Sequence, residues 1–132
     1  MTPCITFIAH GSQKKEANNF LHNMIAEISG GSTAVNLGFL GPGPPSIPEA
    51  LEAHIHKGAQ KIRIIPLFLI PGKHLAHDIP AEIAQVQASY PSVNLKMDEF
   101  IGNSSAFKKI LSDSIRNEEK FMAASESPSA MR

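Results

Sequence analysis

The most apolar run of the chain reads KIRIIPLFLI, from Lys61 to Ile70. A stretch of this character predicts a central strand of a parallel sheet, covered on both faces. Pro66 has no N–H to donate to a neighbouring strand, which weakens the prediction for residues 67–70. The run therefore indicates an α/β domain built around a buried strand that begins near Lys61.

Strand and helix patterns alternate on both sides of this run. Further strands are predicted at 4–9, 33–40 and 93–97, and helices at 16–28, at 47–57, from Asp78 onward and at 104–118. Short connections between alternating strands and helices are typical of a parallel sheet, and right-handed crossovers leave few topologies. We predict a single doubly wound α/β domain: a four-stranded parallel sheet in the flavodoxin-like order 2-1-3-4, with helices on both faces.

Capping signals mark two of the helix starts. Ser46 is followed three residues later by Glu49, the spacing of a capping box. Asp78 precedes Ile79-Pro80 and is predicted to be the N-cap of the third helix. The Ser- and Ala-rich end of the chain predicts a disordered tail. We therefore expect the domain to span residues 1–118 and the tail residues 119–132.

The composition is that of an ordinary globular domain. The chain has 12 Lys and Arg against 12 Asp and Glu, so net charge favours neither nucleic acid nor an anionic membrane as a partner. Cys4 is the only cysteine, which excludes an internal disulfide framework and fits a reducing compartment. The first apolar run ends at His10, too short for a signal peptide, and no run approaches the roughly 20 residues of a membrane span. We expect a cytoplasmic protein.

Two histidines follow the strands that the predicted order makes neighbours. His10 ends the first strand, and His74 lies in the loop after the central one. In such a sheet a crevice opens outside the carboxyl ends of these strands, and two imidazoles there form a pair of ligands for Fe, Co, Ni or Zn. From spacing alone the alternative stays open that His10 packs at a strand end and His74 is solvated. His77 has either a ligand role or an ordinary surface position, and the remaining histidines are expected on helix surfaces: His22, His54 and His56.

Several segments together resemble a known family. They are Phe7-Ile8-Ala9-His10-Gly11-Ser12, Phe39-Leu40, Pro45-Ser46-Ile47-Pro48-Glu49-Ala50-Leu51, Ile64-Ile65-Pro66-Leu67-Phe68-Leu69, Gly72-Lys73-His74 and Asp78-Ile79-Pro80. In this order and spacing, over residues 4–115, they are similar to the small CbiX-type sirohydrochlorin chelatases. The resemblance implies a class II chelatase fold and a lyase-type metal chelatase that inserts Co²⁺, Fe²⁺ or Ni²⁺ into a sirohydrochlorin-type tetrapyrrole, in cobalamin or sirohaem biosynthesis. It also implies that His10 and His74 handle the metal, which is a substrate, and that no organic cofactor is needed.

The sequence departs from the family pattern at two acidic positions. Family members usually carry an acid directly after the Phe-Leu of the second strand and another just before the Pro-Ser, where this chain has Gly41 and Pro44. Metallation displaces two pyrrole protons, and a general base contributes about 10²–10⁴-fold to such a step. The loss leaves three interpretations: a slow enzyme, an enzyme in which histidine accepts the protons, or a non-catalytic carrier of metal or tetrapyrrole with the same fold.

Substrate charge and chain length suggest two further features. Lys14, Lys15 and Lys73 flank the two histidine loops and are candidates to attract the carboxylates of the tetrapyrrole, or are ordinary solvated lysines. Small family members have half the length of the two-lobed chelatases. The resemblance therefore implies a twofold homodimer that completes the cleft, and twofold dimers are also the commonest oligomers.

Overall fold

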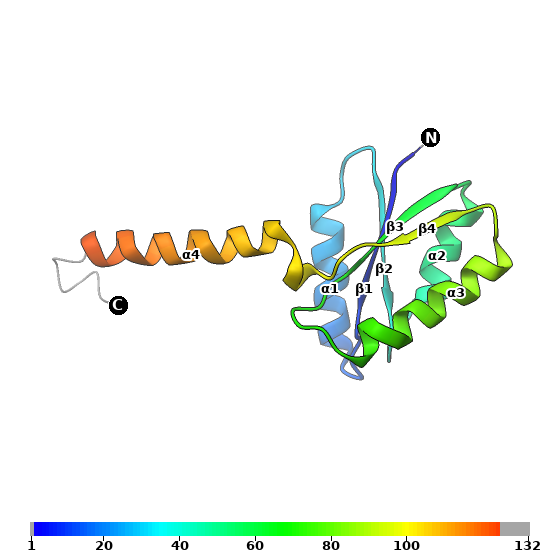
Figure 1. Ribbon diagram of the computed structural model, residues 1–132, viewed down its shortest axis with the longest axis horizontal. Coiled ribbons are helices and arrows are strands. Elements are labelled where there is room, and N and C mark those ends of the chain that lie inside the picture. The colour runs from blue at the N-terminus through cyan, green and yellow to red at the C-terminus, as the bar shows by residue number, and fades with distance from the viewer. Residues whose placement is uncertain (1, 125–132) are drawn as a thin grey trace.

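The computed structural model describes residues 2–124 of the chain (Figure 1). Its elements are β1 (Cys4–Ala9), α1 (Lys15–Ile28), β2 (Ala34–Phe39), α2 (Ile47–His56), β3 (Lys61–Pro66), the π-helical turn η1 (His74–Asp78), α3 (Ile79–Ser89), β4 (Asn94–Met97), the 3-10 turn η2 (Ile101–Asn103) and α4 (Ser105–Ala124). The strands form one four-stranded sheet in the order β2-β1-β3-β4, and every neighbouring pair is parallel. The predicted α/β class and strand order are confirmed.

One face of the sheet is closed by α2 and α3, which lie on the side opposite α1 (Figure 1). The largest apolar cluster fills this layer, and six of its side chains have no exposed surface: Ile8, Ile47, Leu51, Ile62, Ile64 and Ile79. Ser46 and Glu49 form the predicted capping box at the start of α2. These contacts hold the two crossover helices firmly on the sheet.

His54 belongs to this closed layer, so its predicted surface position is wrong. The residue lies on α2, is buried, and its Nε2 lies 3.0 Å from the carbonyl oxygen of Ile5 on β1. Burial lowers the pKa of His54 from its ordinary value, and Lys57 lowers it further, against an opposing effect of the Ile5 hydrogen bond. The imidazole therefore serves as a neutral donor that ties α2 to the sheet.

The opposite face is covered over only part of its width. Leu21 and Ile25 of α1 pack over Leu37 and Phe39 of β2 and form a second apolar cluster. Beyond β1 the same face of β3 carries Arg63, whose side chain is 59% exposed. The prediction that the central strand is covered on both faces therefore holds for the α2–α3 face alone.

Helix α4 leaves the α/β body and extends away from it (Figure 1). The turn before it is anchored, because the N–H of Gly102 donates to the carbonyl oxygen of Phe68 at 2.9 Å. The backbones touch so closely here that a β-carbon on Gly102 would overlap the carbonyl oxygen of Leu69. Ser104 caps the helix by accepting from the N–H of Phe107 at 3.1 Å. The direction of α4 is thus set by η2.

Two predicted boundaries differ from the structure. β3 ends at Pro66, the residue that cannot donate to the ladder, and Leu69 and Ile70 beyond it are exposed. α4 continues to Ala124, so the predicted disorder is wrong for residues 119–124, where Glu, Lys, Met and Ala favour helix. The rest of the predicted tail, 125–132, lies outside the described residues. Within residues 2–124 no helix has both the length and the apolar character needed to cross a bilayer.

Candidate metal site

The two predicted metal-site histidines meet at the carboxyl edge of the sheet. His10 directly follows β1, and His74 opens η1 after the loop that follows β3. Their ring centroids are 4.8 Å apart and the rings are inclined at 68°, an edge-to-face arrangement. Because β1 and β3 are parallel neighbours, their carboxyl ends bring together side chains 64 residues apart in sequence. The structure thus brings the two rings together, and both remain exposed to solvent.

The hydrogen bonds of the two rings leave the same nitrogen free in both. Nδ1 of His74 lies 2.8 Å from Oδ2 of Asp78, and Nδ1 of His10 lies 3.1 Å from the carbonyl oxygen of Gly11. A carbonyl or carboxylate oxygen accepts, so each Nδ1 carries the ring proton and each Nε2 keeps its lone pair. A metal-binding histidine usually donates the N–H of its other ring nitrogen to an acceptor such as these.

Asp78 is therefore not the helix cap that was predicted. Its backbone is already helical, and its side chain makes no capping hydrogen bond. The physical reason is the π-helical turn His74–Asp78, which begins the helical path five residues earlier and supplies carbonyl partners to the amides of α3. The carboxylate is thereby released to orient His74.

The turn that presents His10 is held by a residue that sequence reasoning missed. Gly11 has a φ of +92°, and a β-carbon there would overlap the carbonyl oxygen of Pro42, so only glycine fits. The buried amide of Asn18 accepts from the N–H of Ser12 at 2.9 Å and donates to the carbonyl oxygens of Ser12 and Pro42. It ties the His10 loop to the loop after β2. The sequence contained one signal for this role of Asn18, namely a polar residue on the sheet-facing side of the predicted helix.

An open cleft of about 420 Å³ lies beside the histidine pair. It is lined by His10, Leu40, Gly41, His74, Asp78, Ala81 and Glu82. A β-carbon on Gly41 would lie 2.9 Å from the carbonyl oxygen of His10 and 3.7 Å from Cε1 of its ring, so the backbone would have to shift to admit a side chain beside this ring. Pro44 is exposed and does not line the cleft. A larger hollow nearby is lined by residues from 71 to 100 but contains no histidine, so the chemistry lies in the smaller cleft.

Glu82 supplies a carboxylate to this cleft from α3. Within residues 2–124 its Oε2 is the buried side-chain oxygen that lacks a hydrogen-bond partner. Burial raises the pKa of Glu82 above its ordinary value, and the negative charge of Asp78 raises it further. His74, Asp78 and Glu82 follow one another at intervals of four residues, a helical spacing that would have revealed the group had the helix been predicted to start at His74.

The other candidate residues lie around the cleft. His77 is exposed and does not line it, and no group of three His, Cys, Asp or Glu in the described part of the chain is arranged around a metal position. Lys14 and Lys15 begin α1, and Lys73 precedes η1. All three lysines are exposed at the edge of the sheet that carries the histidines, without lining the cleft. On this chain, His10 and His74 are therefore the residues at this edge that could hold a metal ion.

Comparison with known sequences identifies relatives that are longer than this chain. It is 36% identical over 106 residues to the sirohydrochlorin ferrochelatase of Bacillus subtilis (strain 168) and 32% identical over 100 residues to the sirohydrochlorin cobaltochelatase of Priestia megaterium. The alignments cover 77% and 74% of this chain, but 40% and 32% of the two relatives. The chain thus spans less than half the length of these relatives.

Solved structures share the fold. SirB from Bacillus subtilis with Fe³⁺ superposes with a TM-score of 0.70 at 32% identity, over 89% of this chain and 47% of that one. A putative cobalamin (vitamin B12) biosynthesis CbiX protein from Marinobacter aquaeolei VT8 gives a TM-score of 0.71 at 23% identity, over 89% of this chain and 97% of that one. The family model described as CbiX matches residues 4–118. On this match over most of its length, the chain belongs to the CbiX family.

Proposed function

We propose that this protein is a sirohydrochlorin chelatase that inserts a divalent metal ion, Co²⁺, Fe²⁺ or Ni²⁺, into a sirohydrochlorin-type tetrapyrrole. The observation that carries the proposal is the pairing of His10 and His74, 4.8 Å between ring centroids, at an open cleft. Two Nε2 lone pairs hold the metal substrate and leave its other coordination positions to water. The ring nitrogens of the tetrapyrrole replace those waters as the metal is transferred. The names of the relatives support this substrate class.

Metal insertion releases two protons from the pyrrole nitrogens, and this site contains groups to accept them. As the metal leaves, Nε2 of His74 becomes free to bind a proton, and Asp78 stabilises the imidazolium. The carboxyl group of Glu82, which lines the same cleft, accepts the other. The raised pKa of this carboxyl makes Glu82 a stronger base than an exposed glutamate. Glu82 thereby fills the role of the acid that is missing at Gly41.

Three further features belong to this proposal. The exposed Lys14, Lys15 and Lys73 at the same edge attract the carboxylates of the tetrapyrrole. A second copy of the chain supplies the opposite wall of the cleft in a twofold homodimer. The enzyme acts in the cytoplasm, in the pathway to sirohaem or to cobalamin.

The test is a turnover assay followed by absorbance. Purified protein, excess sirohydrochlorin and Co²⁺ or Fe²⁺ are mixed, and multiple turnovers are expected. His10→Ala and His74→Ala should each lower the rate about 100-fold or more, because each removes a metal ligand, while His77→Ala, the matched control, stays within about twofold. Equal rates in the two site variants and the control would refute the proposal.

The absence of both family acids supports a second candidate, a non-catalytic carrier of metal or tetrapyrrole. Gly41 borders the cleft where the first acid would stand, and Pro44 lies outside it. A carrier binds metal or tetrapyrrole stoichiometrically and does not accelerate their reaction. The same assay separates the two, because only the enzyme converts more than one equivalent of tetrapyrrole per chain.

A further inference from the structure

We infer that a hollow beside the start of α1 holds one carboxylate of the tetrapyrrole and so fixes how the macrocycle is turned over the histidine pair. The inference rests on the proposed function and adds to it a second contact point for the same substrate. Three observations carry it. Free hydrogen-bond donors gather in the hollow, none of the described residues that line it is acidic, and it shares a wall with the histidine cleft.

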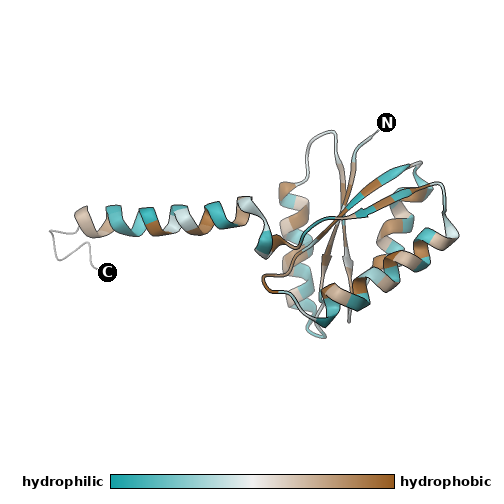
Figure 2. Cartoon of the chain, in the orientation of Figure 1, coloured by the Kyte–Doolittle hydropathy of each residue, from teal (hydrophilic) through white to brown (hydrophobic). Residues whose placement is uncertain are grey.

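The hollow has a volume of about 470 Å³ and lies between the start of α1 and the loop after β2. Most of the residues that line it have polar side chains. The start of α1 is hydrophilic, and apolar residues become frequent further along the helix (Figure 2). His22 forms one side of the hollow, and its Nε2 lies 3.3 Å from the carbonyl oxygen of Pro44. Helix and loop are therefore joined across the hollow.

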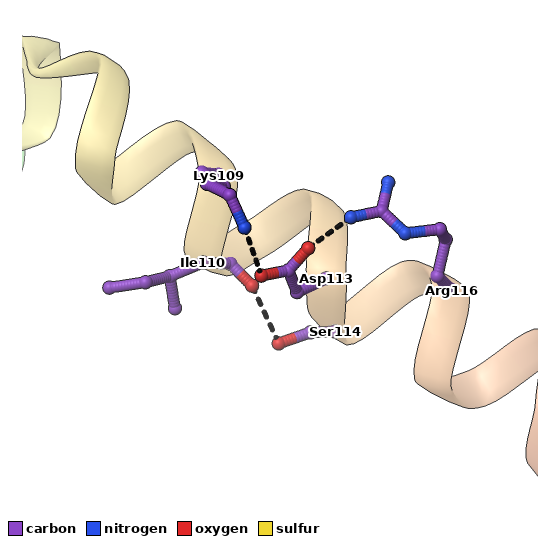
Figure 3. A network of polar contacts seen from close by, with 5 residues as sticks. All are labelled: Lys109, Ile110, Asp113, Ser114 and Arg116. Carbon is purple, nitrogen blue, oxygen red and sulfur yellow. Dashed lines mark hydrogen bonds and ion pairs between the residues drawn. The ribbon is translucent and has the colours of Figure 1, made fainter.

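Three side chains in the hollow are donors without a partner. Within residues 2–124, the side chains of Gln13, Lys15 and Asn19 make no hydrogen bond or ion pair. All three residues are exposed, so a ligand can reach them. The lysine that Figure 3 shows on α4, in contrast, is paired with Asp113. The hollow thus offers one positive charge and two amide groups to a ligand.

The charge of the hollow is not compensated by the chain itself. The described residues that line it include no Asp or Glu. Glu16, next to Lys15 in sequence, is exposed and does not line it. Glu49, on the helix after the loop, accepts from the N–H of Ser46 at 2.8 Å. A cation and neutral donors without a nearby anion favour a negatively charged ligand, and a carboxylate accepts hydrogen bonds from both kinds of donor.

The hollow and the histidine cleft are separated by one thin wall. His10 and Gly41 line the cleft. Ser12 and Pro42, which follow them in the same two segments, line the hollow. The N–H of Gly41 donates to the carbonyl oxygen of His10 at 2.6 Å, and the buried amide of Asn18 bonds both Ser12 and Pro42. The position of the hollow relative to His10 is therefore fixed.

This fixed position explains why the ligand is a carboxylate of the tetrapyrrole. A sirohydrochlorin-type macrocycle carries its carboxylates on side chains around the rim, outside the central nitrogens that receive the metal. With the central nitrogens at His10 and His74, a rim carboxylate reaches over the thin wall to Lys15 and Asn19. Two contact points leave the ring fewer orientations than one does, and this holds the nitrogens in place for metal transfer.

The first experiment compares two asparagines of α1 by fluorescence titration of the full-length protein with metal-free sirohydrochlorin. Asn19→Asp places a negative charge in the hollow and should raise the dissociation constant about tenfold or more, because it repels the carboxylate. Lys15→Gln removes the cation and should raise it about fivefold. Asn23→Asp is the matched control, because it adds the same charge to an exposed position of the same helix that does not line the hollow. It should stay within about twofold.

The same proteins separate this inference from the proposed function. Co²⁺ affinity, measured by calorimetry, should be equal in all of them, because each keeps His10 and His74. Equal sirohydrochlorin affinity in Asn19→Asp and Asn23→Asp overturns the inference while the chelatase proposal stands. A loss of Co²⁺ affinity in Asn19→Asp shows that the substitution disturbs the His10 turn, and this also overturns the inference. A wild-type protein that does not bind sirohydrochlorin refutes both.

The second experiment locates the carboxylate by cross-linking. A water-soluble carbodiimide activates a carboxylate of bound sirohydrochlorin, and Nζ of a lysine in contact with it forms an amide bond as the urea leaves. Peptide mass spectrometry should find the tetrapyrrole on Lys15 in preference to Lys57, an exposed lysine between α2 and the start of β3. Equal labelling of the two lysines overturns the inference.

Discussion

The two faces of the sheet differ in how completely helices cover them. On one face α2 and α3 leave side chains such as Leu51 and Ile64 with no exposed surface. On the other, α1 covers β2 and part of β1, while Arg63 of β3 stays exposed and α4 points elsewhere. The closed face contains the larger apolar cluster, and it also carries Asp78 and Glu82 on the flank of α3 beside the cleft. On the open face, the helices of residues 2–124 leave part of the sheet uncovered.

The largest effect is expected from a substitution that disrupts the closed face. Leu51→Ala creates a cavity in a fully buried site and should lower the free energy of unfolding by about 2–5 kcal/mol in urea denaturation. Ile110→Ala, an exposed site on α4, should change it by less than about 0.5 kcal/mol in dilute monomer. Equal losses of unfolding free energy at the two positions would contradict the difference in packing between the closed face and α4.

The next largest effect is expected from a substitution on the flank of α3 beside the cleft. Glu82→Gln keeps the size of the side chain but cannot accept a proton, and should lower the rate of metal insertion about 100-fold. Because the pKa of Glu82 is raised and the base must be ionised, the wild-type rate should increase as pH rises through that pKa. The Glu82→Gln variant should lose this increase of rate with pH. Glu27→Gln, on the exposed last turn of α1, serves as the control. An unchanged rate and pH profile in Glu82→Gln would assign the proton to another group.

A smaller effect is expected from the residue that orients His74. Asp78→Asn should weaken Co²⁺ binding about tenfold in titration calorimetry, because the amide accepts the Nδ1 proton less strongly than the carboxylate does. Tetrapyrrole binding without metal should stay the same. If Co²⁺ affinity is also unchanged, the hydrogen bond to His74 does not contribute to the site.

The smallest effect concerns the buried imidazole of the closed face. The pKa of His54 is lowered in the folded chain. Below about pH 6.5 the unfolded chain therefore binds a proton that the folded chain does not bind. Stability should therefore fall as pH drops from about 6.5 toward the lowered pKa. Urea denaturation at several pH values measures the slope, and His54→Gln should flatten it. Parallel slopes in the two proteins would contradict a neutral buried His54.

The sequence predicted the parts that depend on regular local patterns. Alternating strands and helices gave the strand order, and that order brought His10 and His74 to one edge. The role of Asp78 was missed because Asp before Ile-Pro is a strong capping signal. That signal gives no indication of the π-helical turn that precedes α3. Glu82 was missed for the same reason, since its interval from His74 matters only if the helix starts there.

The position of α4 depends on information of another kind. Phe107, Ile110, Leu111 and Ile115 were predicted on one side of a helix, and they lie on the exposed stripe of α4. An amphipathic pattern states that a helix has an apolar side, but it does not state against which surface that side packs. His54 illustrates the same limit, because its burial depends on the long-range contact with Ile5.

Gly102 determines how the last helix joins the rest of the chain. Because a β-carbon there would overlap the carbonyl oxygen of Leu69, replacement by any larger residue must displace either the loop at Leu69 or the turn that starts the last helix. One methyl group at this elbow would therefore redirect some 20 residues of chain. The course of an entire helix is encoded here in the smallest side chain that a protein can carry.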